Sequence, residues 1–331
     1  MVTVKEIAAK SILRTSGTVD PWFISRAGMN LYRGCAHACA YCDGRAEKYR
    51  VEGDFGSDIQ AKINAVEILR KELGPDRSAQ PELWPGEQNR SGGFLLLGGG
   101  VGDSYQPAEE RRGLARGVLQ LFAERRRPVH VLTKSSLVLR DADLLERIAM
   151  DAGALVSFSL STSDDATAAL LEPGAPPPSD RLRALESFAR RGIPGGVFLM
   201  PVIPFLTDSA RAIDRTVAAA CSAGARYVLF GGLTMKGGRQ RDHFLAAIEA
   251  ARPGLRERID SLYPGPEPGR PDWGSAVPGY YAEVSRRFAA AARKHGIPPR
   301  IPRELFEKTV SPAELAGILH EHARCFRERE Q

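Results

Sequence analysis

Six short apolar segments, each followed by a helical pattern, constrain the fold of this 331-residue chain more than any other feature. The segment 154–161 alternates as a strand does, with Val156, Phe158 and Leu160 on one face and serines on the other. The predicted strands cover 29–33, 94–97, 129–133, 154–161, 196–202 and 227–231. Helical patterns follow at 58–73, 107–126, from 141, at 179–191 and at 209–223. Parallel strands need a helix to cross back over the sheet, so this order predicts an α/β fold with a parallel sheet.

The pattern changes near residue 235. Beyond that point, the sequence predicts helices at 242–251, 279–295 and 311–328, and a segment rich in proline and glycine at 263–273 separates the first two. We therefore expect three parts: an irregular N-terminal lead-in at 1–26, a barrel-like core at 27–235, and a mostly helical C-terminal extension at 236–331.

Composition is typical of a soluble globular protein, with 43% hydrophobic and 26% charged residues. No apolar run approaches the ~20 residues of a membrane span, and the N-terminus has no signal-like apolar stretch. We expect a cytoplasmic protein without a membrane partner, and the small number of cysteines fits a reducing compartment. A net charge of +6 permits an anionic substrate and leaves nucleic acid open as a partner.

Three of the five cysteines, Cys35, Cys39 and Cys42, fall within eight residues at C-x3-C-x2-C spacing. An odd set of thiols in one short loop indicates a metal or a cluster with several soft sulfur ligands. Iron–sulfur clusters use one thiolate per iron, so three cysteines on a four-iron cluster leave one iron with an open coordination position. A structural zinc site is the alternative, because His37 lies within the same loop and would complete a Cys3His set.

This loop, with the aromatic Tyr41 directly before its last cysteine, resembles the cluster loop of radical S-adenosylmethionine (SAM) enzymes. The resemblance implies that Cys35, Cys39 and Cys42 hold a [4Fe-4S] cluster whose fourth iron binds SAM. It also implies a partial (β/α)6 TIM-type barrel. The implied function is reductive cleavage of SAM to a 5′-deoxyadenosyl radical, which abstracts hydrogen from an unidentified substrate. An external electron donor of the flavodoxin or ferredoxin type is the implied partner.

The same resemblance predicts part of the SAM-binding site. The run Gly98, Gly99 and Gly100 follows the second predicted strand, where the superfamily commonly presents a Gly-Gly-Glu segment to the SAM amino group. Here the acidic residue arrives later, as Asp103. Tyr41 stands where the superfamily places an aromatic ring beside adenine.

Four further polar residues near predicted strand ends are candidate SAM contacts. Lys134 ends the third predicted strand and either pairs with the SAM carboxylate or points to solvent. Ser159 and Ser161 lie on the polar face of the fourth, where they either bind ribose hydroxyls or simply line the barrel. Arg181, at the start of the next helix, is a second candidate for the carboxylate.

Within the superfamily, segments 30–43, 133–141 and 201–208 resemble the spore photoproduct lyase-like branch. That branch includes DNA-repair lyases and members of unknown substrate, so the resemblance implies ancestry without naming a substrate. Two other functions stay open. One is a zinc-stabilised nucleic-acid-binding protein, and the other is a radical SAM enzyme that cleaves a different bond of SAM.

Overall fold

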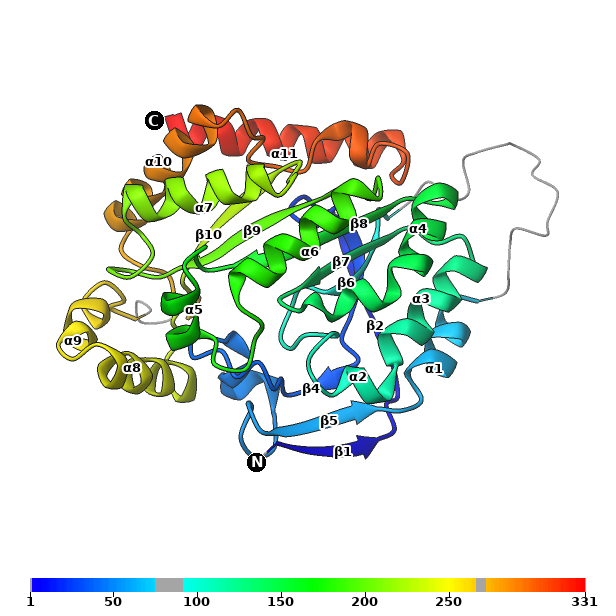
Figure 1. The fold of residues 1–331 in the computed structure, drawn as a ribbon, viewed down its shortest axis with the longest axis horizontal. Helices are drawn as coiled ribbons and strands as arrows, with labels where there is room; N and C mark the ends of the chain where they lie inside the picture. The colour runs from blue at the N-terminus through cyan, green and yellow to red at the C-terminus, as the bar shows by residue number, and fades with distance from the viewer. Residues whose placement is uncertain (1, 75–91, 266–271, 331) are drawn as a thin grey trace.

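The computed structural model describes residues 2–74, 92–265 and 272–330. Its main feature is a curled seven-stranded sheet with the order β10-β9-β8-β7-β6-β3-β2 (Figure 1). Six strands pair in parallel, and β2 joins the edge antiparallel to β3. The strands are β2 (Leu13–Asp20), β3 (Ser25–Met29), β6 (Leu95–Gly98), β7 (Val129–Thr133), β8 (Ala154–Leu160), β9 (Gly195–Val202) and β10 (Val228–Gly232). The predicted partial barrel is confirmed.

Helices follow the parallel strands, and α3, α4, α6 and α7 lie along one face of the sheet (Figure 1). The helices up to β10 are α1 (Ala65–Glu72), α2 (Glu109–Arg112), α3 (Leu114–Glu124), α4 (Ala142–Asp151), α5 (Asp165–Leu171), α6 (Pro178–Arg190) and α7 (Ala210–Ser222). Side-chain caps begin two of them, because Asp164 and Ser209 accept hydrogen bonds from the backbone N–H groups of Thr167 and Ala212.

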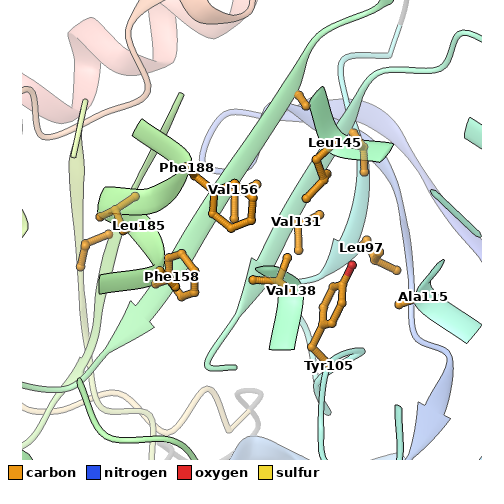
Figure 2. Close-up of a cluster of buried hydrophobic side chains, with 14 of the residues drawn as sticks. Leu97, Tyr105, Ala115, Val131, Val138, Leu145, Val156, Phe158, Leu185 and Phe188 are labelled. Carbon is orange, nitrogen blue, oxygen red and sulfur yellow. The ribbon is translucent and has the colours of Figure 1, made fainter. Parts of the chain in front are cut away.

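The outer face of the sheet carries the larger part of the core. Val131, Val156 and Phe158 point toward the helices and pack with side chains such as Leu145 and Phe188 (Figure 2). All five are buried, and burying each such side chain contributes roughly 1.5–3 kcal/mol. This packing fixes which face of the sheet each strand residue meets, and therefore which residues face the barrel interior.

The inner face is divided between a packed part and a cavity. Leu155 and Phe198 on this face pack with Ile301, Phe306 and other apolar side chains near the C-terminus. The carboxyl ends of the strands instead border an open cavity, described below. C-terminal residues therefore close part of the barrel interior and leave the strand ends accessible.

The C-terminal extension is helical, as predicted. It contains α8 (Arg239–Ala251), α9 (Leu255–Asp260), α10 (Pro278–Lys294) and α11 (Pro312–Glu330). Residues 266–271 of the predicted proline- and glycine-rich segment lie outside the described residues. In the described parts of the chain, no helix has both the length and the apolar character needed to cross a membrane.

The prediction was wrong near the N-terminus. The described residues 2–26 are not irregular, because they include β1 (Thr3–Ile7) and the whole of β2. The expected helix at 58–73 begins only at Ala65, and Asp58–Lys62 is strand β5. The strand predicted at 29–33 is also divided, since β3 ends at Met29 and β4 (Tyr32–Arg33) pairs elsewhere.

Most of these differences result from a second sheet with the order β1-β5-β4 (Figure 1), whereas β2 is a strand because it pairs antiparallel with β3 at the edge of the first sheet. β5 pairs in parallel with β1 and antiparallel with β4. Ile59 and Ala61 alternate into the core as strand residues do. Hydrogen bonding to two neighbouring strands therefore overrides the helical periodicity of this segment.

Candidate active site

A cavity of about 780 Å³ lies at the carboxyl ends of the strands. It is bordered by the loop after β4 and by residues at or just after the carboxyl ends of β6, β7, β8, β9 and β10. Parallel α/β barrels place their chemistry on these loops. The predicted site residues that line this cavity are Cys35, Cys39, Cys42, Tyr41, Gly99, Gly100, Asp103, Lys134 and Ser159.

The cysteine loop begins at Gly34, whose φ of +74° suits glycine. A Cβ atom at this position would lie 2.8 Å from the carbonyl oxygen of Asp58. The Cys35 N–H donates to the Phe55 carbonyl at 2.9 Å. The buried Gln106 side chain accepts from Ala36 N–H at 2.9 Å and donates to the Gly34 carbonyl at 3.2 Å. The first cysteine is therefore fixed by β5 and by the loop after β6.

The second half of the loop is held by side chains that the sequence analysis did not identify. The buried Arg45 donates to the carbonyls of Ala38 and Cys39, at 3.3 and 3.4 Å. Gln240 on α8 donates to the Tyr41 carbonyl at 3.1 Å. The C-terminal extension thus contributes directly to the shape of the cysteine loop.

The thiols have the chemistry expected of cluster ligands. Burial raises the pKa of Cys39 to about 12, and it also raises the pKa values of Cys35 and Cys42. Bound metal deprotonates such thiols and compensates for the cost of burying thiolates. In the described residues, no three His, Cys, Asp or Glu side chains are grouped as one metal ion requires. Because each thiolate of a four-iron cluster binds a separate iron, three thiols around one cavity fit such a cluster.

His37, the fourth ligand of the zinc alternative, is oriented by an aspartate. Its Nδ1 lies 3.4 Å from Oδ2 of Asp103, and its buried Nε2 has no hydrogen-bond partner among the residues that the structure describes. Asp103 also accepts hydrogen bonds from Lys134 N–H, Tyr105 N–H and Thr133 Oγ1, each at 2.8 Å. Asp103 therefore fastens the turn after β6 to the end of β7 and orients His37.

Gly98 does not line the cavity, unlike the two glycines that follow it. Its φ is +96°, and a Cβ atom there would lie 2.2 Å from the Leu132 carbonyl oxygen. Its role in the structure is thus close packing against β7, while Gly99 and Gly100 present backbone to the cavity.

Lys134 lines the cavity, which removes the alternative that it only projects into solvent. Its ammonium donates to Ser159 Oγ at 3.1 Å and lies 5.7 Å from the centre of the Tyr41 ring. Burial lowers the pKa of Lys134, but the nearby Cys39 and Glu172 outweigh this effect and raise the pKa above its usual value. The cavity therefore contains one firmly protonated amine.

Arg181 and Ser161 do not line the cavity and meet instead at Glu172. The Arg181 guanidinium lies 2.5 Å from one Glu172 oxygen, and the other oxygen accepts from Ser161 at 3.2 Å and from the Tyr41 hydroxyl. Burial alone would raise the pKa of Glu172, but Arg181 and Lys134 lower it. The sequence analysis missed Glu172, because nothing in its loop distinguishes it before the chain folds.

Comparison with known proteins decides the family. The model of the radical SAM superfamily matches residues 29–217, which include the cysteine loop and most of the sheet. The chain belongs to the radical SAM superfamily. This membership supports SAM-dependent radical chemistry in general, and the family typically uses a [4Fe-4S] cluster, SAM and an external reductant.

Several proteins are similar in sequence to this radical SAM chain over much of its length. An uncharacterized protein of Mycobacterium tuberculosis is 31% identical over 268 residues, covering 79% of this chain and 74% of the relative. An uncharacterized protein of Methanocaldococcus jannaschii is 28% identical over 220 residues, covering 66% and 74% respectively. The similarity extends to an uncharacterized protein of Acidianus two-tailed virus, at 25% over 178 residues, 53% of this chain and 56% of the viral protein.

Aromatic side chains that the sequence analysis did not predict also line the cavity, and we call this group the aromatic rim. It consists of Trp22, Phe23, Tyr49 and Tyr281, and the Phe23 ring stacks on Phe198 with the ring centres 5.4 Å apart. These residues come from the N-terminal segment, the 3₁₀ helix Glu47–Tyr49 and α10. Only folding brings them to one opening, so local patterns carried no signal for them.

Proposed function

We propose that this protein is a radical SAM enzyme in which Cys35, Cys39 and Cys42 bind a [4Fe-4S] cluster and the adjoining cavity binds SAM. The observation that carries this proposal is the convergence of three cysteine thiols, one protonated lysine and a glycine turn on a single cavity. Superfamily membership supports the same chemistry.

When bound, the cluster and SAM supply reductive cleavage to a 5′-deoxyadenosyl radical, which abstracts hydrogen from the substrate. The protein positions and shields this chemistry. Lys134 is placed to pair with the SAM carboxylate, and the Gly99 and Gly100 backbone is placed to contact the SAM amino group. Ser159 and Tyr41 are suited to the ribose and the adenine.

Residues outside the cavity contribute by holding the residues that line it in position. Glu172, held by Arg181 and Ser161, fixes the Tyr41 ring and contributes to the charged state of Lys134. Asp103 orients His37, and Gly98 allows the close approach of the turn to β7. The aromatic rim limits the access of water to a reactive radical.

The proposal also covers the domain boundaries, the branch of the superfamily, the cellular location and the electron donor. We assign residues 27–235 to the radical SAM core and 236–331 to an extension that supports the cysteine loop through Gln240. The resemblance of segments 30–43, 133–141 and 201–208 supports the spore photoproduct lyase-like branch. Cysteine usage favours the cytoplasm, where a flavodoxin or ferredoxin supplies the electron.

Anaerobic purification and reduction test this function. We expect a brown protein with about four irons per chain, which converts SAM to 5′-deoxyadenosine when reduced. Replacing any one of the three loop cysteines by alanine should remove the cluster and SAM cleavage, whereas Cys221→Ala should retain both. An iron-replete, active Cys39→Ala variant would contradict the ligand assignment.

The same experiment separates the alternatives. A colourless protein with one zinc per chain that binds nucleic acid would identify the zinc-stabilised binder. Fragments of SAM other than 5′-deoxyadenosine would identify cleavage of a different SAM bond.

A further inference from the structure

A second cavity, of about 910 Å³, adjoins the first. Tyr49 and Val101 line both cavities, so the two share part of one wall. The second cavity is built on the small β1-β5-β4 sheet, the chain that follows β1, and the segment 48–52. No residue of the proposed cluster or SAM site lines it.

The charged side chains that line the second cavity are almost all positive. The cationic residues that line it are Lys10, Arg14, Arg33, Lys48, Arg50 and Lys62, against a single carboxylate, Glu52. All except Lys62 are exposed. Across the described portion of the chain, none of the six takes part in an ion pair, whereas many other arginines do. In the described residues, the cavity therefore concentrates positive charge that Glu52 offsets only in part.

Lys62 shows that these cations act on one another. Its side chain is buried, and its ammonium donates to the Asn30 carbonyl at 2.6 Å. Burial, followed by the charges of Arg14 and Arg33, lowers its pKa to about 8. Glu72 acts in the opposite direction, but its carboxylate already accepts hydrogen bonds from backbone N–H groups. A buried cation repelled by its neighbours is stabilised when an anion binds.

We propose that the second cavity binds a phosphate group of the substrate while the reacting part of that substrate occupies the first cavity. Arginine forks and lysine ammonium groups are the donors that proteins use for phosphate oxygens. Tyr49 and Val101 border both cavities, so a substrate that extends past these two residues would occupy both. This inference rests on the proposed function, because it takes the first cavity as the place of reaction.

The test measures anion binding separately from the radical chemistry. Isothermal titration calorimetry of the anaerobic, cluster-loaded protein with pyrophosphate should show saturable binding. Arg14→Gln/Arg33→Gln should weaken it roughly 100-fold, or about tenfold for each lost charge-assisted contact. The matched control is Arg211→Gln/Arg252→Gln, which removes two exposed arginines that line neither cavity. We expect the control to bind pyrophosphate as the wild type does.

A second double variant tests the cavity even if Arg14→Gln/Arg33→Gln fails to fold. Lys10→Gln/Arg50→Gln replaces two other exposed cations of the cavity and should also weaken pyrophosphate binding. Titrations with AMP and with single-stranded oligonucleotides of increasing length distinguish the phosphate sources. Affinity that rises with length identifies a polynucleotide backbone, and affinity equal to that of AMP identifies a small phosphorylated substrate.

Absence of saturable binding by pyrophosphate, AMP and oligonucleotide would overturn the proposal. Equal affinity losses in the cavity variants and the control would overturn it too. Iron content and SAM cleavage are measured on the same samples. Absence of phosphate binding by wild-type protein with an intact, active cluster rejects only this inference, and phosphate binding by protein that forms no cluster rejects only the proposed function.

Discussion

Replacing Arg181 by methionine should strongly destabilise the protein, because it leaves Glu172 buried without its guanidinium. Arg181 is 1% exposed and Glu172 is 2% exposed, and their charged atoms lie 2.5 Å apart. Removing one partner of such a pair costs about 3–5 kcal/mol. Tyr41 and Ser161 still donate to Glu172, so we expect a loss near the lower limit, about 3 kcal/mol.

A double-mutant cycle isolates the ion pair from the packing of the methionine. Guanidinium unfolding at pH 7, followed by circular dichroism, would give the free energies of unfolding. Glu172→Gln/Arg181→Met removes both charges and should recover much of the stability that Arg181→Met loses. Additive losses in the two single variants, or a loss below about 1 kcal/mol for Arg181→Met, would refute the reasoning.

The same pair predicts a pH dependence whose sign follows from Glu172. Its folded-state pKa is lowered below the ordinary 4.5, chiefly by Arg181 and Lys134 against the opposing effect of burial. The stability that Glu172 contributes is therefore fully present above pH 4.5 and is lost as the pH falls through the folded-state value. The wild type should lose more stability on acidification than Glu172→Gln/Arg181→Met does. Parallel curves would show that Glu172 is not the responsible group.

Two other predictions concern the cavity and its supporting turn. Lys134→Ala should weaken SAM binding in calorimetry by about 1.5–3 kcal/mol with unchanged iron content, and unchanged affinity would remove Lys134 from the SAM site. Gly98→Ala should lower the thermal midpoint more than Gly192→Ala does. Both positions have positive φ, but only a Cβ at Gly98 would meet the Leu132 carbonyl, whereas Gly192 faces open space. Equal shifts would mean that steric contact with β7 is unimportant.

Local sequence determined two features of this protein. The spacing of Cys35, Cys39 and Cys42 is a property of eight consecutive residues, so it could be interpreted without knowledge of the fold. The parallel strands were likewise predictable, since apolar runs such as 154–161 and the helices between them are local patterns. The parallel arrangement of the strands could also be predicted, because consecutive parallel strands need a crossover connection between them.

Tertiary structure decided what surrounds these features. β5 is a strand only because β1 and β4 hydrogen-bond to it, although its own periodicity favours a helix. Glu172 became part of the site only when α6 brought Arg181 to it and the cysteine loop brought Tyr41. Such contacts join residues far apart in the chain, so their energies depend on the complete fold and leave no trace in local composition.

The second cavity, likewise, could not be predicted from local sequence. Arg14, Arg33 and Lys62 are separate in the sequence, and each resembles an ordinary charged surface residue there. The fold brings Arg14 on β2 close to Arg33 and Lys62 on the small sheet and buries Lys62, which creates a positive field that no single segment possesses. Sequence alone therefore indicated the superfamily and the parallel core, because both depend on short-range spacing. The tertiary structure decided how charge is arranged around that core, because electrostatic interactions depend on distance in space.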